Sequence, residues 1–295
     1  MTTAISIGEC MVELRPVEDG HLKRGFAGDA YNTAVYLKRS DPSIDVAFLT
    51  ATGDESLSDA MVGTWRSEGI NDKHVFRIPG QRPALYLIET NAKGDRKFHY
   101  WRSESPAKEW LRLLLAAGGA EVLDRADLVY VSGISLAILT HADRVAAIEL
   151  LGTLKTKLAF DPNIRPALWE SMDEARHMFE AMAKISSILL PSRQDYQLMY
   201  GMDDPDEQVR FTKRLTDGEI ALTCDEDGCR LRVADEIIAM PTKAVKVVDT
   251  SGAGDSFNGA YLAARLKGRT AQEAAKAGLE MAARVVAQPG AIIPR

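Results

Sequence analysis

The chain of 295 residues has no excess of basic residues, since 36 Lys and Arg stand against 42 Asp and Glu, for a formal charge of −6. A protein that binds nucleic acid must meet its phosphates with a basic stripe or patch, and the sequence has none. Small molecules are therefore the expected partners, and nucleic acid is not.

Long apolar runs are lacking too. The most apolar window, Leu111 to Leu123, is interrupted by Arg112 and Glu121, and it falls far short of the roughly 20 apolar residues that a membrane helix needs. An apolar segment beginning at Ala4 leaves no room for a charged-then-apolar signal peptide. We expect a cytoplasmic protein with no membrane partner.

Cysteine is scarce, and Cys10, Cys224 and Cys229 show no metal-ligand spacing. The five histidines are equally scattered, so neither residue type indicates a metal centre or a catalytic pair. The sequence also contains no Gly-x-x-x-x-Gly-Lys-Ser/Thr loop, which excludes a P-loop nucleoside triphosphatase. Any chemistry must come from other groups.

What is present is the composition of a folded protein whose length suits one large α/β domain with a small appendage, residues 1–295. Short β-rich runs alternate with helical stretches, which predicts a doubly wound, largely parallel sheet flanked by helices. The expected strands are Ile5–Gly8, Val46–Thr50, Leu128–Ser132, Leu158–Asp161, Ile188–Pro191, Ile220–Cys224 and Val245–Val248. The expected helices are Ala30–Lys38, Ser56–Glu68, His141–Lys155, Gln194–Tyr200, Asp206–Leu215, Ser256–Lys267 and a last one that begins with a Thr270 to Glu273 capping box and ends near Ala287.

Several of these strands end in small or polar residues, and open parallel sheets bind ligands at the carboxyl ends of their strands. Any one such residue is more often part of an ordinary loop, but their recurrence predicts a shared cleft. The residues are Ser132 and Gly133, then Asp161, Asn163 and Arg165, then Ser192, then Asp225, and then Asp249 with the glycine turn that follows it.

One stretch breaks the alternation, because Ala84–Thr90 and Asp95–Arg102 read as two strands of a hairpin. A three-residue loop over residues 92–94 would place Tyr86 opposite Tyr100 and Ile88 opposite Phe98. Tyr86, Tyr100 and Arg102 then share one face. This face is either a polar recognition surface or a half-exposed pair of aromatic residues. With residues 10–27, residues 84–102 are expected to form a small β-sheet lid.

The most informative segment runs from Asp249 to Phe257 and reads Asp-Thr-Ser-Gly-Ala-Gly-Asp-Ser-Phe. The amides of Gly252, Ala253 and Gly254 have almost no side chain around them, so they can turn toward an anion at the N-terminus of the following helix. Asp255 would be the catalytic base beside this anion hole. Taken alone, the segment also fits a tight turn in which Asp255 complements the helix dipole.

This segment, followed by Gly259, resembles the signature of the PfkB or ribokinase-like family of carbohydrate kinases, and the resemblance covers the whole chain. The segment from Gly25 to Ala34 is similar to the sugar-binding turn and helix of that family. Within the family, the residues around Glu9, Phe98–Arg102, Ser132–Leu139 and Gly290–Arg295 are similar to the 2-keto-3-deoxygluconate kinases.

The resemblance implies ATP-dependent phosphorylation of the 6-hydroxyl of a sugar acid, with Mg²⁺ as cofactor, and self-association through the lid. By position, Gly28, Asp29 and Asn32 would contact substrate hydroxyls. Two arginines from separate segments could hold a carboxylate by charge-assisted hydrogen bonds. The residues expected around the carboxylate and keto end are Tyr86, Tyr100, Arg102 and Arg165.

The resemblance also places Asn163, Ser192, Asp225, Gly228, Gly252 and Gly254 near the nucleotide. Here the chain departs from the wider family, whose Asn-x-x-Glu pattern becomes Ser192-Arg193-Gln194-Asp195. Asp195 keeps a carboxylate that could reach Mg²⁺ through water. Asp249 and Ser251 resemble a loop that holds a monovalent cation such as K⁺ in some members, although an ordinary turn also explains them.

Two other functions stay open at this point. The first is a kinase of the same fold that acts on a neutral sugar, such as fructose or ribose, or on a nucleoside. The second is a sugar or nucleotide sensor without catalysis, for which a degraded base or anion turn would be expected, whereas both are intact here.

Overall fold

The computed structural model describes residues 1–17, 20–90 and 96–295. It contains a nine-stranded sheet in the order β13-β12-β11-β10-β9-β8-β1-β4-β5. The strands from β11 to β5 are parallel, while β12 and β13 are antiparallel to their neighbours. The bounds are β1 Thr3–Ile7, β4 Asp45–Thr52, β5 Val75–Arg77, β8 Leu128–Ser132, β9 Lys157–Asp161, β10 Ile188–Leu189, β11 Glu219–Thr223, β12 Cys229–Val233 and β13 Glu236–Met240.

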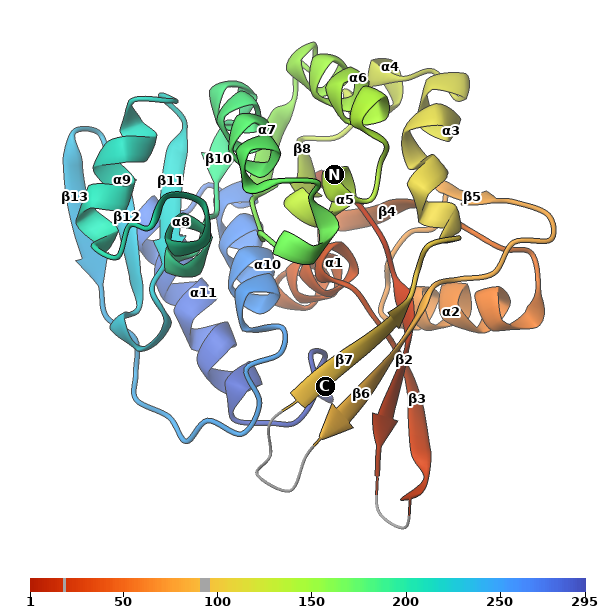
Figure 1. The fold of residues 1–295 in the computed structure, drawn as a ribbon. Coiled ribbons are helices and arrows are strands. Elements are labelled where there is room, and N and C mark those ends of the chain that lie inside the picture. Colours follow the sequence, from red (N-terminus) through yellow and green to blue (C-terminus); the bar gives the residue numbers. More distant parts are fainter. Residues whose placement is uncertain (18–19, 91–95) are drawn as a thin grey trace.

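Helices cover both faces of this sheet (Figure 1). On one face lie α1 Asp29–Ser40, α2 Ser56–Ser67, α10 Ala253–Leu266 and α11 Ala271–Val286; on the other lie α3 Trp110–Ala116, α4 Ala120–Leu123, α5 Gly133–Ala137, α6 His141–Gly152, α7 Met172–Ile185, α8 Arg193–Tyr200 and α9 Pro205–Lys213. Successive side chains of a strand point to opposite faces, so Val129 and Val131 enter one core while Leu128 and Tyr130 enter the other. Because both faces are buried, these strands read as continuous apolar runs.

A second, four-stranded sheet projects from the body in the order β3-β2-β6-β7 (Figure 1). It consists of β2 Met11–Pro16, β3 Leu22–Ala27, β6 Leu85–Thr90 and β7 Arg96–Trp101. The hairpin register is confirmed, since Tyr86 pairs with Tyr100 and Ile88 with Phe98. The expected loop over residues 92–94 lies outside the described residues.

The expected fold class is confirmed: a largely parallel sheet flanked by helices, with a smaller sheet attached. The Thr270 to Glu273 capping box is present at the start of α11. Among the described residues, no helix is both long and apolar enough to cross a membrane.

The strand expected over Val245–Val248 is wrong. The segment has no ladder partner, and Val247 and Val248 are more than half exposed, so β-branched side chains alone did not make a strand. The hairpin of β12 and β13 was not predicted, because Arg230 and Arg232 interrupt its apolar residues. Helix α7 was also missed, although Ser171 and Glu174 begin it with a recognisable N-cap.

Candidate active site

The glycine turn forms the N-terminus of α10, as expected from the sequence. Gly252 is the N-cap residue and has a left-handed backbone, with φ of 73°. A Cβ at Gly252 would also lie 2.5 Å from the carbonyl oxygen of Ala291. Two independent reasons therefore require glycine at this position: its left-handed backbone and the close approach of the C-terminal segment.

The amides of this turn are only partly available. Ala253 N donates to the carbonyl oxygen of Thr250 over 3.3 Å, a long bond that closes the turn. Within the described part of the chain, the amides of Gly252 and Gly254 have no acceptor, which is normal for the first turn of a helix. The amides of Gly252 and Gly254 can thus meet an anion directly. The amide of Ala253 must first release its hydrogen bond to Thr250.

Substitution of Gly252 tests this geometry. We expect Gly252→Ala to lower the free energy of unfolding by about 1–2 kcal/mol from the left-handed backbone alone, with the Ala291 clash adding to it. Gly254 is the matched control, because nothing lies within 4 Å of a Cβ built there and alanine favours helices. In denaturant unfolding, Gly254→Ala should be at least as stable as the parent. Equal stability of the two variants would contradict the assignment.

Asp255 lies in the first turn of α10 and is held by α1. Asn32 Nδ2 donates to Asp255 Oδ2 over 2.8 Å. Asn32 is in turn anchored to Gly28, whose carbonyl accepts from Asn32 N over 2.7 Å. Helices α1 and α10 can come close because Gly259 has no side chain, and a Cβ there would meet Thr33 O at 2.7 Å. Gly28, Asn32 and Asp255, which are far apart in sequence, therefore meet at one point.

The pKa of Asp255 is raised to about 7, first by burial of the carboxyl group and then by the nearby charge of Asp29. The hydrogen bond from Asn32 and the charge of Arg165 act in the opposite direction. The positive end of the α10 dipole favours the ionised carboxylate, but burial has the larger effect on the pKa of Asp255. A carboxylate with a pKa near neutrality is well matched to taking a proton from an alcohol.

This pKa predicts a pH dependence of turnover. The base acts only when ionised, so kcat/KM should rise about tenfold per pH unit below pH 7 and reach a plateau above it. Initial rates between pH 5.5 and 9, with nucleotide and metal saturating, measure this. A flat profile over this range, as a base with the ordinary aspartate pKa of about 3.9 would give, would exclude a titrating base with the raised pKa of Asp255.

A second carboxylate lies beneath the site. Asp161, at the end of β9, is buried and accepts from Asn258 Nδ2 at 2.8 Å, from Asn163 N at 3.0 Å and from Tyr130 Oη at 3.3 Å. Burial raises the pKa of Asp161 well above its usual value, and the charges of three neighbouring aspartates add to this. The sequence placed Asp161 at a strand end but assigned it no role, and it did not single out Asn258.

Asn163 contacts the start of α1. The family resemblance predicts that it lies near the nucleotide, and in the structure its Nδ2 donates to Asp29 Oδ2 over 2.9 Å. Its backbone is left-handed, with φ of 38°, a strained geometry that asparagine tolerates better than most residues. Asp29 begins α1, so the loop after β9 orients an acidic side chain at the turn expected to bind sugar hydroxyls.

Tyr86, Tyr100 and Arg102 lie together on one face of the small sheet, as expected. The rings of Tyr86 and Tyr100 lie 5.8 Å apart, and the guanidinium of Arg102 lies 5.7 Å from the ring of Tyr100. The two phenols differ, however, because Tyr86 is buried and donates its hydroxyl to Glu13, while Tyr100 is half exposed. Arg102 is also paired, with the buried Glu9. The sequence gave no signal for either glutamate partner.

Arg165 is exposed, and its one hydrogen bond within the described residues goes to its neighbour's carbonyl, from Nη1 to Ile164 O at 3.1 Å. Burial raises the pKa of both Tyr100 and Asp255, and the charge of Arg165 opposes that rise in each. Arg165 therefore lies near the small sheet and near the base, and its guanidinium donors remain available for a ligand.

The residues expected near the nucleotide follow β10 and β11. Ser192 caps α8 and pairs with Thr223 of the next strand in a parallel bridge. Both carboxylate oxygens of Asp195 accept hydrogen bonds, Oδ2 from Ser192 N and Oδ1 from Ile164 N, each at 2.8 Å. Asp225 and Gly228 lie in the turn after β11, both with positive φ. No group of three metal-ligating side chains is found among the residues that the structure describes.

Asp249 connects the glycine turn to the C-terminal segment. Its Oδ1 accepts from Ser251 N at 2.9 Å and its Oδ2 from Gly290 N at 2.6 Å. These bonds give Asp249 a structural role in holding the segment after α11 against Gly252.

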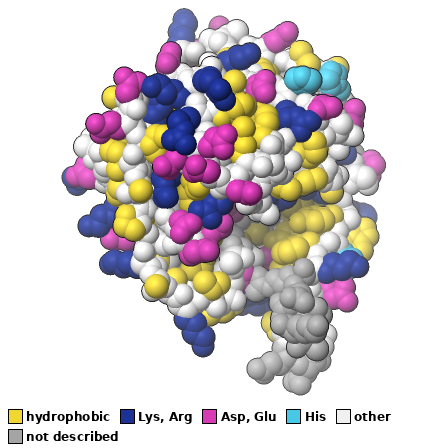
Figure 2. Space-filling view, turned by 60° about the vertical axis from the view of Figure 1, so that its left-hand side comes forward, with side chains coloured by type: hydrophobic (Ala, Val, Ile, Leu, Met, Phe, Trp, Pro, Cys, Tyr) yellow, Lys and Arg dark blue, Asp and Glu magenta, His cyan; other side chains and the backbone are white. Residues whose placement is uncertain are grey.

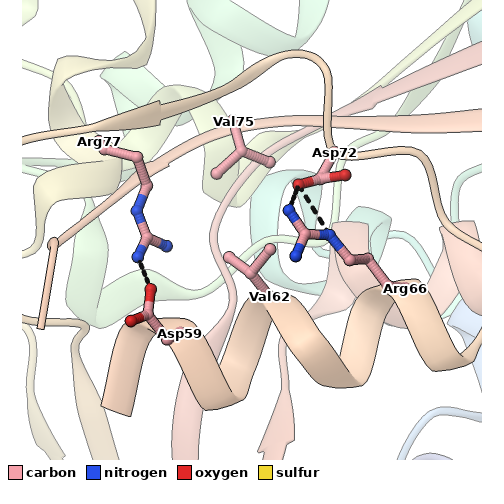
Figure 3. Close-up of a pocket in the computed structure, with 6 residues that line it drawn as sticks. All are labelled: Asp59, Val62, Arg66, Asp72, Val75 and Arg77. Carbon is pink, nitrogen blue, oxygen red and sulfur yellow. Dashed lines mark hydrogen bonds and ion pairs between the residues drawn. The ribbon is translucent and has the colours of Figure 1, made fainter. Parts of the chain in front are cut away.

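A pocket of about 290 Å³ lies elsewhere, between α2 and the edge strand β5 (Figure 3). Its charged side chains are paired, Arg77 with Asp59 and Arg66 with Asp72. It is separate from the glycine turn and from the strand ends that carry the residues above.

A carboxylate and two amides without acceptors lie at one helix N-terminus, over the carboxyl ends of a parallel sheet that carries a smaller sheet, in a ribokinase-like fold. The fold together with the similarity to curated kinases identifies the chain as a phosphotransferase. Residues 1–295 match the pfkB family carbohydrate kinases, and the chain belongs to that family.

Individual similarities are consistent with this assignment. The chain is 38% identical over 297 residues to the 2-dehydro-3-deoxygluconokinase of Dickeya dadantii, covering 98% of this chain and 96% of that protein. The solved 2-dehydro-3-deoxygluconokinase of Thermotoga maritima superposes with a TM-score of 0.82 at 21% identity, covering 99% and 96% of the two chains. A protein of Escherichia coli described as a ribokinase II, solved with ATP and Mg²⁺, gives 0.83 at 19% identity, covering 99% and 94%. The two similarities to solved structures, at 21% and 19% identity, show the fold alone.

Proposed function

We propose that this chain is an ATP-dependent kinase that phosphorylates the 6-hydroxyl of 2-dehydro-3-deoxygluconate, also called 2-keto-3-deoxygluconate. The observation that carries the proposal is the contact of Asn32 with Asp255 beside the unpaired amides of Gly252 and Gly254. The choice of acceptor is supported by the printed activity of the Dickeya relative and by the unengaged guanidinium donors of Arg165. Residues 1–295 would work as one domain with the four-stranded sheet as its lid.

In this proposal the acceptor lies between α1, the lid and the loop after β9. Gly28, Asp29 and Asn32 contact its hydroxyl groups. The carboxylate and keto end meets the two lid tyrosines, Tyr86 and Tyr100, together with Arg102 and Arg165. A site built to pair a carboxylate discriminates against a neutral sugar, which would leave the guanidinium donors unsatisfied.

The transfer step uses Asp255 as the base. Its carboxylate accepts the proton of the 6-hydroxyl while that oxygen forms a bond to the γ-phosphorus of ATP and the bond from this phosphorus to the bridging oxygen breaks, which releases ADP. The amides of Gly252, Ala253 and Gly254 donate to the phosphoryl oxygens as charge develops on them. Closure of the lid would exclude water from the transfer.

In this proposal the nucleotide lies at the ends of β10 and β11. We propose that Ser192, Asp225 and Gly228 line its site, with Gly252 and Gly254 beneath the phosphates, and that Asn163 acts at the boundary with the acceptor. The unpaired amides at the start of α10 suit phosphate oxygens. Mg²⁺, when bound, neutralises the phosphate charge. Asp195 would reach the Mg²⁺ through water. A K⁺ ion beside Asp249 and Ser251 stays a prediction.

We further propose that two copies associate through the lid. Leu22, Phe98, Tyr100 and Trp101 are all at least 40% exposed on the small sheet. Exposed aromatic residues gathered on one element often mark a contact surface. Figure 2 shows hydrophobic side chains in a hollow of the surface beside the grey residues.

A panel of acceptors tests the function. The rate of ADP formation is measured with 2-dehydro-3-deoxygluconate, fructose, ribose and adenosine at equal concentrations. We expect kcat/KM for the sugar acid to exceed the others by at least about tenfold, the effect of one charged hydrogen bond. A higher value for a neutral acceptor would identify the alternative kinase, and ligand binding without ADP formation would identify a sensor.

A further inference from the structure

Glu9 is a buried carboxylate that the proposed reaction does not use. It lies in the link between β1 and β2, where the chain passes from the body to the lid, and its side chain is 1% exposed. A Cβ at Gly28 would lie 2.2 Å from the backbone oxygen of Glu9, so this residue packs directly beneath the turn that begins α1.

The side chain of Glu9 reaches the lid. Its Oε2 accepts from Nη2 of Arg102, the residue after β7, in an ion pair. Its Oε1 is buried and has no hydrogen bond of good geometry within the described part of the chain, although the Ser105 hydroxyl is near enough to act on the pKa of Glu9. One residue therefore contacts both the lid and the acceptor turn, and its carboxylate is only partly hydrogen-bonded.

This arrangement costs the fold free energy. Burial raises the pKa of Glu9 above its usual range even though Arg102 and Ser105 act to lower it, which shows that the pairing does not compensate fully for desolvation. An apolar residue would fill the same space at lower cost. A partly hydrogen-bonded buried charge that contacts a proposed recognition residue calls for a role beyond stability.

The state of Arg102 indicates that role. Its guanidinium has five N–H donors, and among the described residues only one of its nitrogens, Nη2, makes a hydrogen bond. The group lies over the ring of Tyr100 and is 14% exposed. The remaining donors are thus held in place and can serve a ligand that reaches this group.

We propose that Glu9 is a positioning residue for the acceptor, holding Arg102 beside Tyr100 so that its free donors meet the carboxylate end of the sugar acid. This inference rests on the proposed function. Because Glu9 neutralises Arg102, the net positive charge for the substrate comes from Arg165, while Arg102 supplies oriented hydrogen bonds. Specificity for the acid would then depend on a residue that never touches it.

A double-mutant cycle tests the inference. KM and kcat for the sugar acid are measured in the parent, Glu9→Ala, Arg102→Ala and the double variant. We expect Glu9→Ala to raise KM about tenfold with kcat changed less than about threefold, and to have no further effect once Arg102 is alanine. Glu9→Gln keeps the size and one acceptor, so its KM should rise only about threefold, again only when Arg102 is present.

Glu174→Ala is the matched control. Glu174 forms a similar ion pair with Arg144, which is 4% exposed and belongs to α6, so its loss should destabilise the fold without changing KM. Additive effects of Glu9 and Arg102 on KM, or an unchanged KM in Glu9→Ala and Glu9→Gln, would overturn the inference. If Glu9→Ala does not fold, the Glu9→Gln cycle gives the same decision. Failure of the proposed function is distinct, because the parent would then not phosphorylate the sugar acid.

Discussion

Asp255→Asn should lower kcat by about 10²- to 10⁴-fold, the usual contribution of a positioned base, while the KM for the acceptor changes little. The amide keeps the size of the carboxylate and can still contact Asn32, but it cannot accept the proton. Single-turnover rates of ADP formation with a saturating acceptor measure the effect. Turnover within a factor of about three of the parent would exclude Asp255 as the base.

Thermal unfolding separates this effect from a damaged fold. The pKa of Asp255 in the folded protein, about 7, is higher than in the unfolded chain, about 3.9. Its contribution to stability is therefore present at low pH and is lost as the pH rises through 7. The asparagine variant does not have this loss, so its stability relative to the parent should increase between pH 5 and pH 8. A constant difference would show that the carboxyl group is not desolvated as described.

Arg165→Ala should raise the KM for the sugar acid by roughly 10- to 150-fold, which corresponds to about 1.5–3 kcal/mol for a hydrogen bond to a charged group. The kcat should be nearly unchanged, because the carboxylate end is remote from the hydroxyl that reacts. The assay belongs at pH 8.5, since the charge of Arg165 also lowers the pKa of Asp255 and its removal would otherwise change the ionised fraction of the base.

Two comparisons make the Arg165 result specific. The kcat/KM for a neutral acceptor should be the same in Arg165→Ala and the parent, because there is no carboxylate to lose. Arg112→Ala removes a solvent-exposed arginine that pairs with Glu109 and should change neither substrate's KM. An equal loss for acidic and neutral acceptors would show that Arg165 acts on the fold or the base rather than on the carboxylate.

The elements that sequence predicted well are those whose neighbours are local or whose pattern is imposed by burial. β8, Leu128–Ser132, is buried on both faces, and its apolar run gave its exact bounds. The pairing of Tyr86 with Tyr100 follows from the short hairpin between them. The Val245–Val248 strand failed because only pairing with another strand, which that segment lacks, could have stabilised it.

The site was predictable as a set of strand ends and a glycine turn, but its pairings were not. Asp161 and Asn258 are 97 positions apart, and Glu9 and Arg102 are 93 apart. No local pattern signals such contacts, because they depend on how the helices and the small sheet pack on the large one. For the same reason the hydrogen bond from Asn163 to Asp29, 134 positions apart, could not be predicted from the sequence.

Identification of the product tests the central claim most directly. After incubation with ATP, Mg²⁺ and 2-dehydro-3-deoxygluconate, the account predicts one new phosphomonoester whose phosphorus couples to the two protons of a CH₂ group, as a 6-phosphate must. Release of inorganic phosphate without this ester, or a phosphate attached to a CH carbon, would contradict the claim that Asp255 and the α10 amides direct the phosphoryl group to the primary hydroxyl.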